Sequence, residues 1–525
     1  MSVRVLDCTL RDGGYINDFQ FGKEAIAKII SQLTEANIDI IECGFLEDCE
    51  YDENRSIFNR VEEIKPLIPQ NRKNSLYVAM ACYGEYDLTK LSNYNGTSID
   101  GIRVTFHYNE VDDALEYCKQ IRDKGYKLFI QPVGTTSYSD KQLLTLIRKV
   151  NEIQPFSFYL VDTLGLMDQE EVLRMFYLVN HNLQPEICMG FHSHNNLQLS
   201  FSNCQKLAQL STTRIISLDS SVYGMGRGAG NLNTELIANY LNKSKNTQYE
   251  IEPLLEIIDE FIIYIREKSE WGYSVPYYLA AINGCHPNYA SYLSSKQTLT
   301  VKAISLILRM IEIEKRSLFD KELIECKYKE FQDREIDDSL TMEKLCSAIA
   351  GKNIMLMAPG RSLAEYEQKL LDKITKNNCI VMTVSFVPNF IKPDFVFLSN
   401  NKRYNTTFNL ADKFINLIHT SNIQIIGKDN CFMVNYSDLL NAEDIIIDNS
   451  SLMALNLLIK LKPEKIYLAG LDGYTTDKEN YYTERLNLIQ NTETIIAQNK
   501  AMKNKIAELG KRLKIEFVTP SLYID

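Results

Sequence analysis

A chain of 525 residues, of which 45% are hydrophobic and 24% charged, is long enough for two or three globular domains. Its 57 basic and 68 acidic residues give a net charge of −11 without a basic stripe, which argues against nucleic acid or an anionic membrane surface as a partner. No run approaches 18 consecutive apolar residues and no signal-peptide pattern opens the chain, so we expect a cytoplasmic protein without membrane insertion.

Short apolar, β-branched runs recur about every 30 residues in the first half of the chain, each followed by a segment of helical periodicity. Eight such units in about 235 residues predict an α/β fold, a closed (β/α)₈ TIM barrel with its chemistry at the carboxyl ends of the strands. An open doubly wound sheet is the alternative, but R-D-G-G replaces the glycine-rich dinucleotide turn after the first strand. The predicted strands are residues 4–10, 38–45, 75–82, 101–107, 127–134, 157–165, 186–194 and 214–224.

Polar side chains stand at the carboxyl ends of these predicted strands. His192 and His194 are two positions apart, so both project from one face of an extended strand and can reach one ion. With Asp12 from the neighbouring first strand they form a set that suits Mn²⁺, Mg²⁺, Zn²⁺ or Fe²⁺. The other strand-end residues are Arg11, Glu42, His107, Thr163 and the stretch G-M-G-R-G-A-G-N that ends at Asn231.

Aldol or Claisen chemistry next to a 2-oxo acid needs a lysine that forms an imine or a metal that polarises the carbonyl. No lysine stands at the strand ends named above, which favours the metal route. Arg11 would then help to hold the enolate oxygen through charge-assisted hydrogen bonds.

The motifs T-L-R-D-G, I-E-C-G-F, D-T-L-G, F-H-S-H-N-N and G-M-G-R-G-A-G-N, in this order, resemble those of the DRE-TIM metallolyase superfamily of HMG-CoA lyase-like barrels. The 4-hydroxy-2-oxovalerate aldolase type of pyruvate aldolase is the most similar branch. The resemblance implies that Asp12, His192 and His194 bind a divalent metal with Asn231 beside them, that Arg11 stabilises the pyruvate enolate, and that Thr163 contacts the substrate carboxylate. We expect Mn²⁺, with Mg²⁺, Co²⁺ or Zn²⁺ as alternatives.

The chain departs from this aldolase pattern at Tyr15, where the family carries a histidine shortly after R-D-G. Tyr15 could transfer a proton if the metal and Arg11 lowered its pKa, or it could only line the pocket without taking part in catalysis. His107 and His286 are the other candidates for this role.

We predict three domains: the catalytic barrel at 1–240, a helical extension beside it at 241–335, and a Rossmann-like α/β domain at 345–525. The protein could form a homo-oligomer through this helical extension. The last domain has predicted strands within 353–363, 379–386, 395–400, 423–428, 466–473 and 515–521. Its first turn, A-P-G-R-S, could bind a phosphate with Arg361. The combination of P-G-R-S-L, F-L-S-N-N and Y-L-A-G-L-D-G faintly resembles the nucleotide-binding domains of bacterial sialyltransferase-like and related glycan-assembly proteins, which implies a nucleotide-sugar or surface-polysaccharide setting.

Three functions fit these observations. The first is a metal-dependent aldolase that joins or splits pyruvate, or a related 2-oxo acid, and an aldehyde through a metal-bound enolate. The second is a Claisen-type, acyl-CoA-dependent synthase that resembles isopropylmalate synthase. The third is a non-catalytic barrel that serves as a scaffold for the C-terminal domain.

Overall fold

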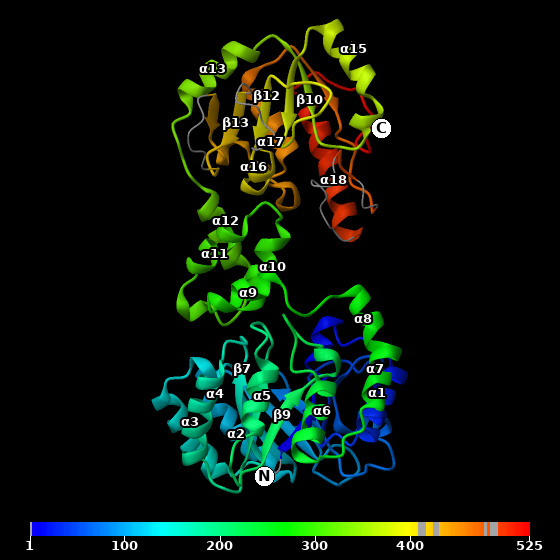
Figure 1. Cartoon of the computed structure of the whole chain (residues 1–525), viewed down its shortest axis with the longest axis vertical. Coiled ribbons are helices and arrows are strands. Elements are labelled where there is room, and N and C mark those ends of the chain that lie inside the picture. The colour runs from blue at the N-terminus through cyan, green and yellow to red at the C-terminus, as the bar shows by residue number, and fades with distance from the viewer. Residues whose placement is uncertain (1–2, 408–415, 424–429, 477–479, 483–491, 525) are drawn as a thin grey trace. The chain divides into compact units, whose positions relative to one another are not determined.

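The computed structural model describes residues 3–407, 416–423, 430–476, 480–482 and 492–524 (Figure 1). The chain divides into two units, Met1–Ser291 with Glu312–Phe319, and Tyr292–Ile311 with Asp320–Asp525. The domain limits expected from the sequence, at 240, 335 and 345, stay predictions. No helix of the described residues combines the length and the apolar character that crossing a bilayer requires.

The first unit contains the predicted barrel. Eight parallel strands follow one another in the order β1-β9-β8-β7-β6-β5-β4-β2, and the pairing of β1 with β2 closes the ring. This confirms the TIM barrel and excludes the open-sheet alternative. The strands are β1 (Val3–Asp7), β2 (Ile40–Leu46), β4 (Leu76–Cys82), β5 (Gly101–Phe106), β6 (Lys127–Pro132), β7 (Ser157–Asp162), β8 (Cys188–Ser193) and β9 (Ile216–Ser220).

Alternation along each strand separates an outer from an inner layer of side chains. On β5, Ile102 and Val104 belong to the core between strands and helices, whereas Arg103 lies between them in sequence and is fully buried. α-Helices cover the strands from outside (Figure 1). These are α1 (Lys23–Glu35), α2 (Val111–Asp123), α3 (Asp140–Ile153), α4 (Gln169–Asn182), α5 (Ser200–Ala208) and α6 (Thr234–Lys245).

Two connections lack the α-helix that the sequence pattern predicted. After β2, the chain forms a short strand β3 (Ile57–Phe58) and two 3₁₀ turns at Val61–Glu63 and Lys65–Leu67. Pro66 stands inside the second turn, where it would break an α-helix. Between β4 and β5, residues 83–100 contain turns and bends only.

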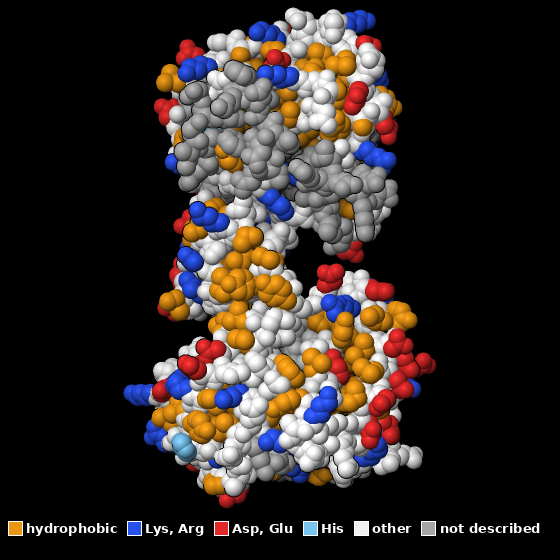
Figure 2. Space-filling view, viewed as in Figure 1, with side chains coloured by type: hydrophobic (Ala, Val, Ile, Leu, Met, Phe, Trp, Pro, Cys, Tyr) orange, Lys and Arg blue, Asp and Glu red, His pale blue; other side chains and the backbone are white. Residues whose placement is uncertain are grey.

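Helices follow the barrel. Leu254, Ile257 and Ile262 from this region join the barrel core. The helices are α7 (Glu252–Ile257), α8 (Ile263–Lys268), α9 (Val275–Ile282), α10 (Pro287–Ser295), α11 (Val301–Arg309), α12 (Lys321–Gln332) and α13 (Ser339–Ile349). Val275, Tyr278 and Ile282 on α9 are each more than 40% exposed, and Figure 2 shows hydrophobic side chains gathered over the segment that contains this helix.

The second unit contains a seven-stranded parallel sheet in the order β14-β13-β12-β11-β10-β15-β16. Ile354 and Leu356 pack in one core with helices α13, α17 and α18, whereas Met355 and Met357 pack in another with α15, so both faces are covered. The elements are β10 (Asn353–Met357), α14 (Ser362–Glu365), α15 (Glu367–Asn377), β11 (Ile380–Val384), β12 (Phe395–Leu398), α16 (Asn401–Thr407), β13 (Asn416–Thr420), β14 (Cys431–Val434), α17 (Ser450–Leu461), β15 (Lys465–Ala469), α18 (Thr492–Leu509) and β16 (Ile515–Phe517).

Two strands of this sheet, β13 and β14, were not predicted from the sequence. The strand expected at 423–428 falls almost wholly at 424–429, outside the described residues. The other five predicted strands contain β10, β11, β12 and β16, and most of β15.

Candidate metal centre and active site

Asp12, His192 and His194 meet at the carboxyl end of the barrel. Asp12 lies in the turn after β1, where its backbone N–H donates to the Cys8 carbonyl at 2.8 Å, while His192 and His194 come from the end of β8. One ligand atom from each residue lies within 4.8 Å of the others, and all three residues are buried. Two imidazoles and a carboxylate at this separation suit a divalent transition metal.

Unpaired buried atoms around these three residues support a ligand at this site. His194 Nδ1, Asn231 Oδ1 and Arg11 Nη2 are buried, and the structure gives none of them a hydrogen-bond partner. Since buried polar atoms are nearly always paired, each of these is an atom that an ion or a substrate would satisfy.

The charges favour the protonation states that metal binding requires. Burial raises the pKa of Asp12, but Arg11, His194, His192 and Arg227 together outweigh it, and the net pKa lies well below the usual value. Burial lowers the pKa of His194 to about 3, so its ring is neutral at physiological pH. A carboxylate and a neutral imidazole are the forms that coordinate metals.

A buried ionic network orients His192. Its Nδ1 lies 3.0 Å from Asp219 Oδ2, which leaves Nε2 for an ion. Asp219 in turn pairs with the fully buried Arg103, whose guanidinium also lies 3.0 Å from Glu42. Asp219 and Arg103 were not predicted from the sequence, although a charged residue inside a strand that is otherwise apolar is a detectable signal.

Arg11 is anchored on two carboxylates. Its Nε donates to Glu42 at 2.8 Å and its Nη1 to Asp12 at 2.6 Å. The third nitrogen, Nη2, is the unpaired one. The guanidinium is therefore fixed beside the candidate metal ligands with one edge left for a substrate oxygen.

Asn231 and Thr163 lie at the same end of the barrel. The Asn231 amide donates to Asp12 Oδ2 at 2.7 Å, and a β-bridge joins Asn231 to His194, so Asn231 holds the ligand set together. Thr163 Oγ1 accepts from the Gly134 backbone N–H at 2.9 Å, which leaves the hydroxyl hydrogen to donate.

Tyr15 borders the open side of the site. The residue is 40% exposed, and its ring contacts Phe19 and Phe45 edge-on at centroid distances of 5.1 and 5.9 Å. The Arg227 guanidinium lies over the Tyr15 ring, 4.0 Å from the centroid. Burial raises the pKa of the Tyr15 phenol above its ordinary value, although Arg227 and Arg11 oppose the rise, so the hydroxyl is protonated at neutral pH.

The two histidines considered for proton transfer have different surroundings. His107 is exposed at the end of β5, and its backbone N–H donates to Glu110 at 2.9 Å. The ring of His286 is half-buried, and its Nδ1 accepts from the Asn288 backbone N–H at 3.2 Å. Burial, followed by the charge of Arg227, lowers the pKa of His286 to about 4.

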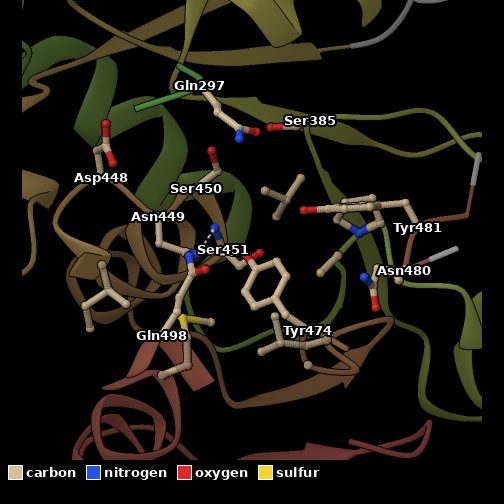
Figure 3. Close-up of a pocket in the computed structure, with 18 of the residues that line it drawn as sticks. Gln297, Ser385, Asp448, Asn449, Ser450, Ser451, Tyr474, Asn480, Tyr481 and Gln498 are labelled. Carbon is tan, nitrogen blue, oxygen red and sulfur yellow. Dashed lines mark hydrogen bonds between the residues drawn. The ribbon is translucent and has the colours of Figure 1, made fainter. Parts of the chain in front are cut away.

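A separate cavity of about 170 Å³, partly open to solvent, lies in the second unit (Figure 3). It lies at the carboxyl ends of β10, β11, β12 and β15, and includes the point where the strand order reverses between β10 and β15. Open α/β sheets bind ligands at such switch points. Side chains with amide or hydroxyl groups gather around it, among them Gln297, Ser385, Asn449, Ser450, Tyr474 and Gln498.

The turn A-P-G-R-S borders this cavity, but a carboxylate already occupies the start of helix α14. Asp472 accepts hydrogen bonds from both the backbone N–H and the hydroxyl of Ser362. An anion at that helix start would meet this negative charge, which argues against the phosphate position predicted there with Arg361.

Known proteins resemble the first half of the chain. Residues 2–260 match the HMGL-like family model. The chain is 25% identical over 245 residues to a 4-hydroxy-2-oxovalerate aldolase of Geobacillus genomosp. 3, with 46% of this chain and 71% of the relative covered. It is also 25% identical over 245 residues to an oxaloacetate decarboxylase of Mycobacterium tuberculosis, with 46% and 70% covered. A solved HMG-CoA lyase of Bacillus subtilis matches with 17% identity and a TM-score of 0.40, over 51% of this chain and 93% of its own.

Proposed function

The barrel of this chain belongs to the HMGL-like family, and from that premise we propose that it is a divalent-metal-dependent aldolase. It would make or cleave a carbon–carbon bond between pyruvate, or a related 2-oxo acid, and an aldehyde. The observation that carries the proposal is the buried set of Asp12, His192 and His194, with ligand atoms within 4.8 Å of one another. The set fits Mn²⁺, which we propose as the native ion.

Each neighbouring residue has a role in this proposal. A bound divalent ion would polarise the carbonyl of the 2-oxo acid and stabilise negative charge on its oxygen. Arg11 would donate from Nη2 to that oxygen, and the Thr163 hydroxyl would donate to the substrate carboxylate. A methyl proton of the 2-oxo acid would first pass to solvent water, and Tyr15 would then donate its proton to the aldehyde oxygen as the new carbon–carbon bond forms, a role consistent with a protonated phenol.

Deuterium uptake into the methyl group of pyruvate tests the first half of this reaction without any aldehyde. The protein with Mn²⁺ in D₂O should exchange the methyl protons, as measured by mass spectrometry, EDTA should abolish the exchange, and added Mn²⁺ should restore it. Exchange that survives EDTA, or no exchange with Mn²⁺ present, would contradict the proposal. Thiol release from acetyl-CoA in the presence of the 2-oxo acid would instead indicate the Claisen-type synthase.

For the second unit, we propose a nucleotide- or phosphate-binding domain in a nucleotide-sugar or surface-polysaccharide pathway. The switch-point cavity supports this, because its amide and hydroxyl side chains can bind a base and a sugar. Gln498 Oε1 lines it and has no hydrogen-bond partner in the structure. Calorimetric titration with CMP and UDP should show binding that Gln498→Leu weakens several-fold, and equal affinities in both proteins would count against this site.

Two further features belong to this proposal. None of the twelve cysteines, all of which lie in described residues, forms a disulfide, which supports a reducing compartment such as the cytoplasm. The exposed apolar residues of α9 support a homo-oligomer formed through the helical segment, which light scattering would detect.

A further inference from the structure

Arg227 is held at the barrel mouth by a loop with little room for other side chains. A Cβ on Gly226 would lie 2.4 Å from Asn231 Nδ2 and 2.9 Å from Asp12 Oδ2. A Cβ on Gly228, where φ is +65°, would lie 2.9 Å from Asn196 Oδ1. Within residues 226–228, therefore, only position 227 can carry a side chain without disturbing the candidate metal centre or its support.

The Arg227 guanidinium has an aromatic partner and no acidic one. It stacks on Tyr15 at 4.0 Å, and among the described residues no carboxylate or carbonyl forms an ion pair or hydrogen bond with it. Arg11 and Arg103, whose guanidinium groups are buried in the barrel, each pair with two carboxylates. A guanidinium stacked on its face keeps its N–H edges free for a bidentate oxyanion.

The position of Arg227 indicates which substrate its guanidinium would bind: the aldehyde, and not the 2-oxo acid. The carboxylate of a 2-oxo acid would lie beside the candidate metal ligands, with Arg11 and Thr163 as its neighbours. Arg227 instead extends over Tyr15, on the exposed side of the site, where the aldehyde would enter. The nearby His286 is neutral at physiological pH and cannot compensate for a missing cation.

We propose that Arg227 forms an anion subsite at the mouth of the barrel, so that the aldehyde partner carries a phosphate or a carboxylate. The anion subsite itself follows from the geometry of Arg227, whereas its assignment to an aldehyde rests on the proposed aldolase function.

Binding of non-reactive analogues tests the subsite. In calorimetric titrations of the full chain with Mn²⁺ and oxalate, glycerol 3-phosphate is compared with glycerol, and 4-hydroxybutyrate with butane-1,4-diol. At least one anion should bind at least tenfold more tightly than its neutral counterpart, and Arg227→Met should remove that preference, since the charge-assisted hydrogen bonds to the guanidinium would be lost. The pair that responds distinguishes phosphate from carboxylate.

A matched control is Arg266→Met, because Arg266 on α8 also stacks on a tyrosine, Tyr223, at 4.9 Å but is not part of this loop. It should keep the preference for the anion. Equal binding of charged and neutral analogues, or an unchanged preference in Arg227→Met, would overturn the subsite. Anion binding through Arg227 without deuterium uptake into pyruvate would instead contradict the aldolase and the assignment of the anion to an aldehyde.

Discussion

Asp219 holds the His192 ring in the orientation that leaves Nε2 available to an ion. Its carboxylate accepts from His192 Nδ1 at 3.0 Å and balances the buried Arg103. We predict that Asp219→Asn raises the Kd for Mn²⁺ about 10–100-fold, since loss of a carboxylate behind a ligating histidine typically has this effect. Isothermal titration calorimetry measures the change.

Asp100→Asn is a suitable control. Asp100 also pairs with an arginine, Arg72, at 2.7 Å, but it precedes β5 and so lies at the opposite end of the barrel. Its Mn²⁺ affinity should equal that of the wild type. An Asp219→Asn protein with unaltered affinity would show that His192 is oriented by other contacts.

Tyr15 and His107 can be separated as proton carriers. Tyr15 lies against Arg227 and beside the candidate metal ligands, whereas His107 is exposed. Tyr15→Phe should therefore reduce kcat for retro-aldol cleavage about 100-fold or more, and His107→Ala should change it less than threefold. Stopped-flow detection of released pyruvate measures both, and the reverse order of effects would assign the proton transfer to His107.

Residues that belong to a short sequence motif could be predicted from the sequence. Residues that act through a contact between distant positions could not. The H-x-H spacing and the T-L-R-D-G turn were enough to bring Asp12, His192 and His194 together as a candidate site. The contact between Asp219 and Arg103 joins positions 116 apart across the barrel interior. It depends on which face of each strand points inward, a matter of register that periodicity leaves open.

At the scale of elements, the loop after β9 supports the candidate metal centre through its glycines. We predict that Gly226→Ala lowers Mn²⁺ affinity at least tenfold, because the added methyl group would displace Asp12 or Asn231. Gly510→Ala is the matched control, since its Cβ would meet only ordinary contacts at 3.5 Å or more. Similar affinities in both variants would mean that the loop can move aside without affecting Asp12.

Helical connections were easier to anticipate where the apolar pattern was strong. Ile26, Ile29, Ile30 and Leu33 recur at helical spacing, and all four are buried in α1. The segments after β2 and β4 were also expected to be helical, but they form 3₁₀ turns and irregular structure instead. A repeating architecture thus predicts strands better than it predicts each connection.

At the scale of the whole molecule, the barrel was recognisable because eight similar units repeat along the chain. The second sheet has short, unevenly spaced strands, and two of them, β13 and β14, have only five and four residues. Length alone does not explain why these two were missed, since β12 and β16 have four and three residues and were predicted. In β13, N-L-I-H-T, only Leu417 and Ile418 are apolar, so it lacks the apolar run that predicts a strand. Its parallel α/β class was predicted, but its strand order and the position of its cavity required the three-dimensional structure.

The central claim is that Asp12, His192 and His194 together bind one divalent ion. Equilibrium dialysis of the folded protein against Mn²⁺, with the bound ion counted by elemental analysis, tests it directly. Asp12→Ala, His192→Ala and His194→Ala should each bind one ion fewer per chain than the wild type. The control His181→Ala, which removes an exposed histidine, should bind as many ions as the wild type. If the three variants retain the wild-type stoichiometry and affinity, the account is contradicted.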